Sequence, residues 1–316
     1  MSYQAPFPPL LERVEYMKIY FHLEIRDLFD LPPFGLLQLR RELLQALAVL
    51  QTSAPEQEQV LRRVLLPERT SDPVRFSRVQ QPSPALVLTP DTRRQGLIEA
   101  GERVVLPVLL LGSGITVLEA FTVLLEEVGR QGLYHGNGRF IVEGIESEDA
   151  SGVRAMLRQK GEPESALTPP ISDLAWWLER QPPLEDAVRL EMLTPLRLVR
   201  NGKPLFRASF GDLFPFILRR VIGMLGHHAA VDVVKDPAAM IALADKVSVH
   251  ENRLSWQDDR SLQQPGSEQK LGGLRGSLAL AGEALGELLW VLRIGSLLNV
   301  GKGAPYGAGQ YRLDKC

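Results

Sequence analysis

The sequence lacks several features that would assign the protein to a class at once. Its 316 residues contain a single cysteine, Cys316, which excludes an intrachain disulfide and a zinc site built from several cysteines. No apolar run reaches the roughly 18 residues that a membrane-spanning helix needs. The first residues, MSYQAPFPPLLERVEY, have no basic start followed by an apolar core, so we predict no signal peptide. We therefore expect a cytoplasmic protein without membrane contact.

A large net charge is also missing. The formal charge at pH 7 is −2, which argues against a protein that binds DNA or RNA by bulk electrostatics alone. The part of the chain from residue 185 onward is mildly basic, and the part before it is acidic. This balance is compatible with a polyanionic ligand but does not require one. Charge alone therefore leaves the ligand class open.

The first half of the chain has the pattern of a small α+β domain. Residues 14–25 (VEYMKIYFHLEI) alternate apolar and polar side chains, which predicts a strand, and leucines at helical spacing over 36–51 predict a helix. Two further strands, a helix and a last strand are predicted at 85–90, 102–112, 115–132 and 138–146. This order is typical of a ferredoxin-like domain, which we assign to residues 1–150.

The second half repeats the plan. Residues 151–184 contain five prolines and are predicted to be a linker. A second strand–helix–strand–strand–helix–strand series follows, with its segments at 187–199, 209–228, 245–257, 270–282, 283–301 and 307–314. We assign it to a domain at 185–316. The expected fold class is α+β, with two tandem ferredoxin-like (RRM-like) βαββαβ domains.

A glycine-rich stretch, NVGKGAPYGAGQYRL, lies near the end of the chain and contains Gly301, Gly303, Gly307 and Gly309. It is no P-loop, because that motif follows a strand and reads GxxxxGK[ST]. It is no dinucleotide-binding loop either, because no βαβ unit follows. Two alternatives remain. The glycines either end a helix and turn into the last strand, or let a phosphodiester approach the backbone beside Lys302.

These residues carry a resemblance to a known family. The loop, the helix ELLWVLRIGSLL and the strand LGGLRGSLALAG resemble the C-terminal end of the CRISPR repeat-processing endoribonucleases of the RAMP superfamily. The segments LTPLRLVRNGKPL, FGDLFPFILRRVIGMLGHH and RLSWQDDRSLQ resemble the corresponding blocks in the same order. The first half is similar more loosely. The chain departs from the family in lacking a cysteine-containing segment after the first helix and a second arginine after Arg260.

The resemblance implies cleavage of CRISPR precursor RNA without metal or cofactor. The 2′-hydroxyl attacks the adjacent phosphorus and leaves a 2′,3′-cyclic phosphate and a 5′-hydroxyl. This chemistry needs a base, an acid and positive charge on the phosphorane, and histidine suits both proton roles. His228 is the first candidate, and His227 and His22 follow. His135, in a glycine-containing turn, is more simply explained as an exposed residue, and His250 lies on a predicted strand that leads to Trp256 and Arg260.

The RNA-binding candidates combine backbone freedom, positive charge and one ring. Lys302 comes first, because it is the single lysine of the loop, and Tyr306 offers a ring for a stacked base. The full set is Gly301, Lys302, Gly303, Tyr306, Gly307, Gly309, Arg219, Arg220 and Arg260. The expected partners are CRISPR repeat RNA or crRNA and other subunits of a CRISPR effector complex, and a homodimer stays open. The alternative function is a non-catalytic RNA-binding RAMP subunit of such a complex.

Overall fold

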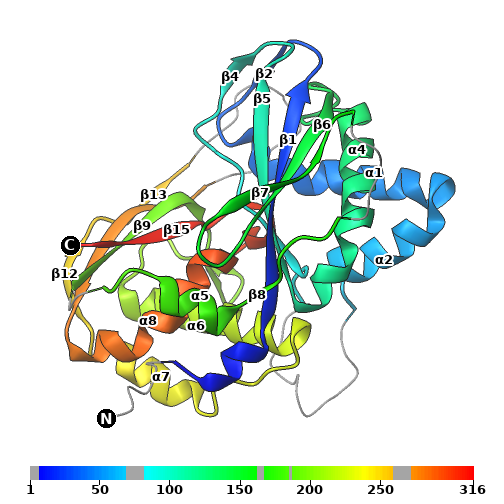
Figure 1. The fold of residues 1–316 in the computed structure, drawn as a ribbon. Helices are drawn as coiled ribbons and strands as arrows, with labels where there is room; N and C mark the ends of the chain where they lie inside the picture. Colours follow the sequence, from blue (N-terminus) through cyan, green and yellow to red (C-terminus); the bar gives the residue numbers. More distant parts are fainter. Residues whose placement is uncertain (1–6, 69–81, 162–166, 185–186, 259–271) are drawn as a thin grey trace. The chain divides into compact units, whose positions relative to one another are not determined.

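The computed structural model describes residues 7–68, 82–161, 167–184, 187–258 and 272–316 (Figure 1). These residues form two compact units. The N-terminal unit comprises Glu15–Ser172 and His227–Ala229, and the C-terminal unit comprises the remaining described residues. The division after Ser172 therefore lies within the stretch that the sequence predicts as a linker.

An antiparallel sheet forms the centre of the N-terminal unit. Its strands are β1 (Glu15–Ile25), β3 (Leu86–Leu88), β5 (Arg103–Leu111), β6 (Phe140–Glu148) and β7 (Arg154–Gln159), in the order β3-β5-β1-β6-β7. In the register of β1, Tyr20 lies opposite Pro107 of β5 and Glu146 of β6. The order of the first four strands is that of a ferredoxin-like domain, and β7 extends this sheet beyond β6.

The alternation in β1 separates two faces of this sheet. The buried set Met17, Ile19, Phe21, Leu23 and Ile25 forms the apolar face. The helices of the unit are α1 (Leu39–Ser53), α2 (Pro55–Leu65) and α4 (Leu118–Gln131), preceded by short 3-10 turns at Gly35–Gln38 and Gly112–Val117. Phe21 contacts Phe121 of α4 at 5.7 Å between ring centroids, and Figure 1 shows α1 and α4 on the same side of the sheet. The opposite face of β1 is polar.

The C-terminal unit has the same topology. Its sheet contains β9 (Ala187–Leu196), β12 (Ser248–Asn252), β14 (Gly273–Ala281) and β15 (Tyr311–Lys315) in the order β12-β14-β9-β15. β13 (Ser255–Gln257) pairs with β14, and β10 (Val199–Arg200) forms a hairpin with β11 (Lys203–Pro204). Its helices are α5 (Leu174–Arg180), α6 (Phe210–His228), α7 (Pro237–Ala244) and α8 (Glu283–Leu298). The prediction of two tandem ferredoxin-like domains is confirmed.

The short elements complete the description. A 3-10 turn at Pro9–Arg13 opens the described chain, and another at Ala304–Tyr306 lies in the glycine-rich stretch. β2 (Phe29–Leu31) pairs with β4 (Gly96–Ile98), and β8 is the two-residue strand Ser172–Asp173. No helix within the described ranges is both long and apolar enough to span a bilayer.

Three described elements lie inside the stretch predicted as a linker: β7, the two-residue β8 and α5. β7 pairs with β6, and α5 begins after Asp173, whose side chain accepts a hydrogen bond from the Trp176 backbone N–H at 2.7 Å. β7 lacks the apolar periodicity that a sequence pattern detects. The residues of β7 are exposed or half-buried throughout, because this strand is the edge of its sheet. The prolines at both ends of α5 concealed a helix of only seven residues.

Candidate functional site

The glycine-rich loop has a backbone that only glycine adopts readily. All four glycines have positive φ, from +66° at Gly309 to +96° at Gly307. A Cβ atom at Gly309 would collide with the Val300 carbonyl, and one at Gly301 would lie 2.7 Å from the carbonyl oxygen of Arg197. Glycine is therefore required at these positions by the loop's own packing, apart from any ligand.

Backbone hydrogen bonds attach the loop to the end of β9. The N–H of Lys302 donates to Arg197 at 2.9 Å, and the N–H of Gly309 donates to Pro195 at 3.1 Å. The Thr194 hydroxyl donates to the Gly307 carbonyl and accepts the Gln310 N–H, both at 2.8 Å. Several amides that could hold a phosphate are thus already used inside the protein. What the loop presents at its surface is Lys302, which is exposed.

Burial divides the other predicted members of the loop. Gly303 is exposed and Gly301 is half-buried, whereas Gly307 and Gly309 are buried. The Tyr306 side chain is only 5% exposed. The prediction that its ring stacks on a base does not fit this burial, because a base needs an open face of the ring. Tyr306 serves as packing beneath the loop.

The two arginines of α6 have different surroundings. Arg219 is exposed, and its guanidinium lies 4.8 Å from the centroid of the Phe216 ring, so it remains a candidate phosphate contact. Arg220 donates from Nε and Nη2 to the carbonyl oxygen of Leu298, the last residue of α8. Burial lowers the pKa of Arg220 to about 10, which still leaves it charged at neutral pH. Arg220 thus caps the C-terminal end of α8, and a phosphate contact at this arginine stays a prediction; Arg260 lies outside the described residues.

His228 is held on both sides of its ring. Its Nε2 lies 2.9 Å from the carbonyl oxygen of Ser83, and its Nδ1 lies 3.1 Å from the Ser113 hydroxyl, all within the N-terminal unit. A carbonyl only accepts, so Nε2 carries a proton, and in the neutral ring Nδ1 accepts from Ser113. The ring of His227 lies 6.1 Å from that of His228, and burial lowers the pKa of His227.

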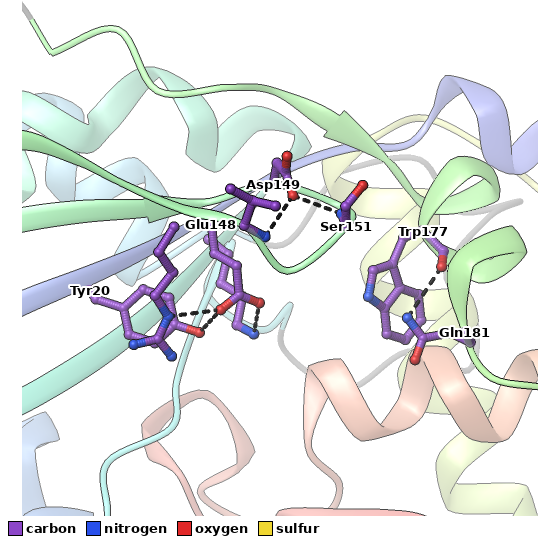
Figure 2. Close-up of polar contacts among 9 residues, drawn as sticks. Tyr20, Glu148, Asp149, Ser151, Trp177 and Gln181 are labelled. Atoms are coloured by element: carbon purple, nitrogen blue, oxygen red, sulfur yellow. Dashed lines mark hydrogen bonds and ion pairs between the residues drawn. The ribbon is translucent and has the colours of Figure 1, made fainter.

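His22 lies on the polar face of the N-terminal sheet. Its Nε2 is 3.1 Å from a carboxylate oxygen of Glu146 on the neighbouring strand β6. Beside it, Tyr20 donates to Glu148 (Figure 2). Lys18 donates to the same carboxylate, with Nζ at 2.6 Å from Oε1. Lys18 and Glu148 thus neutralise one another on this face.

The structure adds two groups of residues to those predicted. A cavity of about 590 Å³ in the C-terminal unit is lined by Phe206 and Trp256, whose ring centroids are 4.7 Å apart, and by Arg207. In the N-terminal unit His135 contacts Arg41, which lies 94 positions earlier in the chain. Sequence spacing gave no signal for either contact, because each joins separate elements.

The architecture and the loop together define a class of protein. Two tandem ferredoxin-like units, the second carrying a glycine-rich loop before its last strand, are the arrangement that the resemblance to the RAMP superfamily implies. Residues 190–311 match the family model of the CRISPR-associated endoribonuclease Cas6, and residues 14–170 match a model described as an N-terminal domain. The C-terminal part of the chain, residues 190–311, thus matches the Cas6 endoribonuclease family.

Solved structures agree with this fold. A Cas6 product complex superposes with a TM-score of 0.55 at 16% identity, covering 95% of this chain and 99% of that one. Thermus thermophilus Cas6 gives a TM-score of 0.51 at 15% identity, with coverage of 95% and 99%. A partial Cas6-RT-Cas1–Cas2 complex gives 0.54 at 14% identity, and 96% of this chain covers 46% of that one. No curated protein matches the chain in sequence.

Proposed function

We propose that this protein is an endoribonuclease that binds CRISPR repeat RNA and cleaves the precursor without a metal ion. The observation that carries the proposal is the glycine-rich loop, which lies inside the segment matching the Cas6 endoribonuclease model and presents an exposed Lys302 on a hydrogen-bonded backbone. A lysine fixed in this way offers a phosphodiester one positive charge. The exposed Arg219 supplies a second cation in the same unit.

The proposed reaction is the transesterification that the 2′-hydroxyl makes possible. The 2′-oxygen attacks the adjacent phosphorus, and the products are a 2′,3′-cyclic phosphate and a 5′-hydroxyl. The candidates for proton transfer predicted from sequence are His228, His227 and His22. Of these, His228 faces the exposed Ser113 hydroxyl, through which a proton could pass, while His22 is paired with Glu146.

A specific observation favours the alternative, a non-catalytic RNA-binding subunit. Both ring nitrogens of His228 are already engaged, so the first predicted proton carrier has no unused nitrogen in this conformation. The same fold and the same Lys302 would bind RNA in either case. For both functions we propose that other subunits of a CRISPR effector complex also contact the bound RNA. Whether the protein forms a homodimer is a separate question, which light scattering of the purified protein answers.

The test is incubation of the purified protein with end-labelled RNA transcribed from the CRISPR repeats of the source genome, in excess EDTA. A discrete product that carries a cyclic phosphate supports the endoribonuclease. Tight binding without any cleavage contradicts it and supports the RNA-binding subunit. Loss of cleavage on adding EDTA, restored by a divalent cation, would contradict the metal-independent reaction.

A further inference from the structure

His135 lies in a strained tight turn between α4 and β6. Tyr134 and Asn137 exchange backbone hydrogen bonds of 3.1 and 2.9 Å across this turn. His135 has a φ of +50° and Gly136 a φ of +82°, the left-handed pair of a type I′ turn. Few residues with a side chain adopt this conformation, and such strain is concentrated at functional sites. The strain makes His135 a candidate for a functional residue.

The imidazole of His135 faces the guanidinium of Arg41, in the first turn of α1. Arg41 Nη1 lies 2.7 Å from Nδ1 and 3.0 Å from Nε2 of the ring. A guanidinium only donates hydrogen bonds, so a neutral imidazole accepts from Arg41 through one ring nitrogen while the other ring nitrogen carries the proton. Burial lowers the pKa of His135, and the charge of Arg41 lowers it further, while Glu42 acts in the opposite direction.

The Glu42 carboxylate forms hydrogen bonds with both His135 and Arg41. Its side chain is 3% exposed, and Oε1 accepts the backbone N–H of His135 at 3.0 Å. The same oxygen accepts a hydrogen bond from Arg41 Nη2. A buried carboxylate with two donors holds its neighbours firmly, because losing either donor would leave charge unpaired in the interior. Glu42 is thus a positioning residue that joins α1 to the turn.

The pair above Glu42 is open to solvent. The Arg41 side chain is 33% exposed and His135 is half-buried. The surface therefore offers a neutral imidazole and a fixed positive charge at one point. These are the two groups that attack by a 2′-hydroxyl on a phosphodiester requires, a base for the proton and a cation for the developing phosphorane charge. The ring contact of Tyr134 with His135, 4.3 Å between centroids, limits the orientations of the imidazole.

We propose that His135 is the general base of RNA cleavage and that Arg41 binds the scissile phosphate, an assignment that rests on the proposed endoribonuclease function. An arriving phosphate offers Arg41 a charged acceptor, which is stronger than a ring nitrogen, and so releases the imidazole lone pair. The proton of the 2′-hydroxyl passes to that lone pair. The O2′–P bond forms as the P–O5′ bond breaks, O5′ takes a proton from water, and the protonated His135 returns its proton to the hydroxide so formed.

The test is single-turnover cleavage of repeat RNA, with protein in excess and EDTA present. His135→Asn removes the imidazole but keeps a residue type that tolerates the left-handed turn. Arg41→Gln removes the charge. The matched control is His250→Ala, since His250 is exposed on β12 of the other unit. We expect His135→Asn to slow cleavage by about 10²–10⁴-fold while RNA affinity stays within about twofold, and the control to cleave normally.

A second readout separates catalysis from a structural role. In Arg41→Gln the pKa of His135, followed by NMR of the ring protons, rises, and the acid limb of the pH–rate profile moves to higher pH with it. Wild-type cleavage by His135→Asn would overturn this inference and leave the endoribonuclease standing. Equal losses of binding and cleavage in that variant would also overturn it, because His135 would then be only an RNA contact. A wild-type protein that cleaves no repeat RNA overturns both proposals.

Discussion

Arg220 donates two hydrogen bonds to the carbonyl oxygen of Leu298, from Nε at 3.2 Å and from Nη2 at 3.0 Å. The acceptor ends α8 immediately before the glycine-rich loop. We expect Arg220→Ala to lower the free energy of unfolding by about 1.5–3 kcal/mol, the range for hydrogen bonds that involve a charged group. Urea denaturation measures this. The neighbouring Arg219→Ala, at an exposed position, should change it by about 0.5 kcal/mol or less. If both variants lowered the free energy of unfolding by the same amount, the capping role of Arg220 would be contradicted.

Gly309 tests whether the loop needs glycine for its own fold. Its φ is +66°, and a Cβ atom there would collide with the Val300 carbonyl. We expect Gly309→Ala to destabilise the protein by more than about 1 kcal/mol in thermal or urea unfolding. The control is Gly223→Ala in α6, where an added Cβ meets nothing within 4 Å. That variant should be stabilised by about 0.5–1 kcal/mol, because alanine favours a helix.

Lys302→Ala tests the proposed RNA contact of the loop. Removing one exposed cation should weaken binding of repeat RNA and reduce the slope of log K against log salt by about 1. Fluorescence anisotropy across a salt series measures both. Lys246→Ala is the control, because Lys246 is also exposed and lies in the same unit, after α7. An unchanged affinity in Lys302→Ala would leave the loop as a purely structural turn.

The cavity beside Trp256 is the place where we expect an unpaired base of bound RNA. Phe206 is 58% exposed and meets the Trp256 ring edge to face. Stacking a base on such a ring contributes about 1–3 kcal/mol. Trp256→Ala should lower RNA affinity by that amount, measured in the same anisotropy assay, and repeat RNA should quench Trp256 fluorescence. Leu97→Ala, at a 63% exposed residue of the N-terminal unit, is the control and should bind normally.

Glu148 makes stability depend on pH. Burial acts to raise its pKa, but hydrogen bonds from Lys18 and Tyr20 outweigh this and lower the pKa below the ordinary 4.5. A carboxyl with a lowered pKa stabilises the fold above its unfolded pKa, and that stability is lost as pH falls through the folded pKa. Thermal melts from pH 7 to pH 3 should therefore fall less steeply in Glu148→Gln. Parallel curves would contradict the linkage.

Local pattern was enough for most of the fold. The alternation in β1 and the leucine spacing in α1 follow from which side chains face the core, and this is a property of neighbouring residues. The same reasoning identified an exposed lysine in a glycine-rich turn at Lys302. It missed β7, an edge strand without a buried face.

The sequence by itself determined the order of the elements, and with it the two ferredoxin-like units. The reason is that the spacing of apolar side chains, which distinguishes a strand from a helix, is visible within a short segment of the chain. Only the tertiary structure decided which predicted side chains reach the surface. Tyr306 is packed beneath its loop, and Arg220 donates hydrogen bonds to the carbonyl oxygen of Leu298 at the end of α8. It also brought His135 to Arg41 across 94 positions of the chain. Burial and contact depend on elements far apart in sequence, so no local pattern contains them.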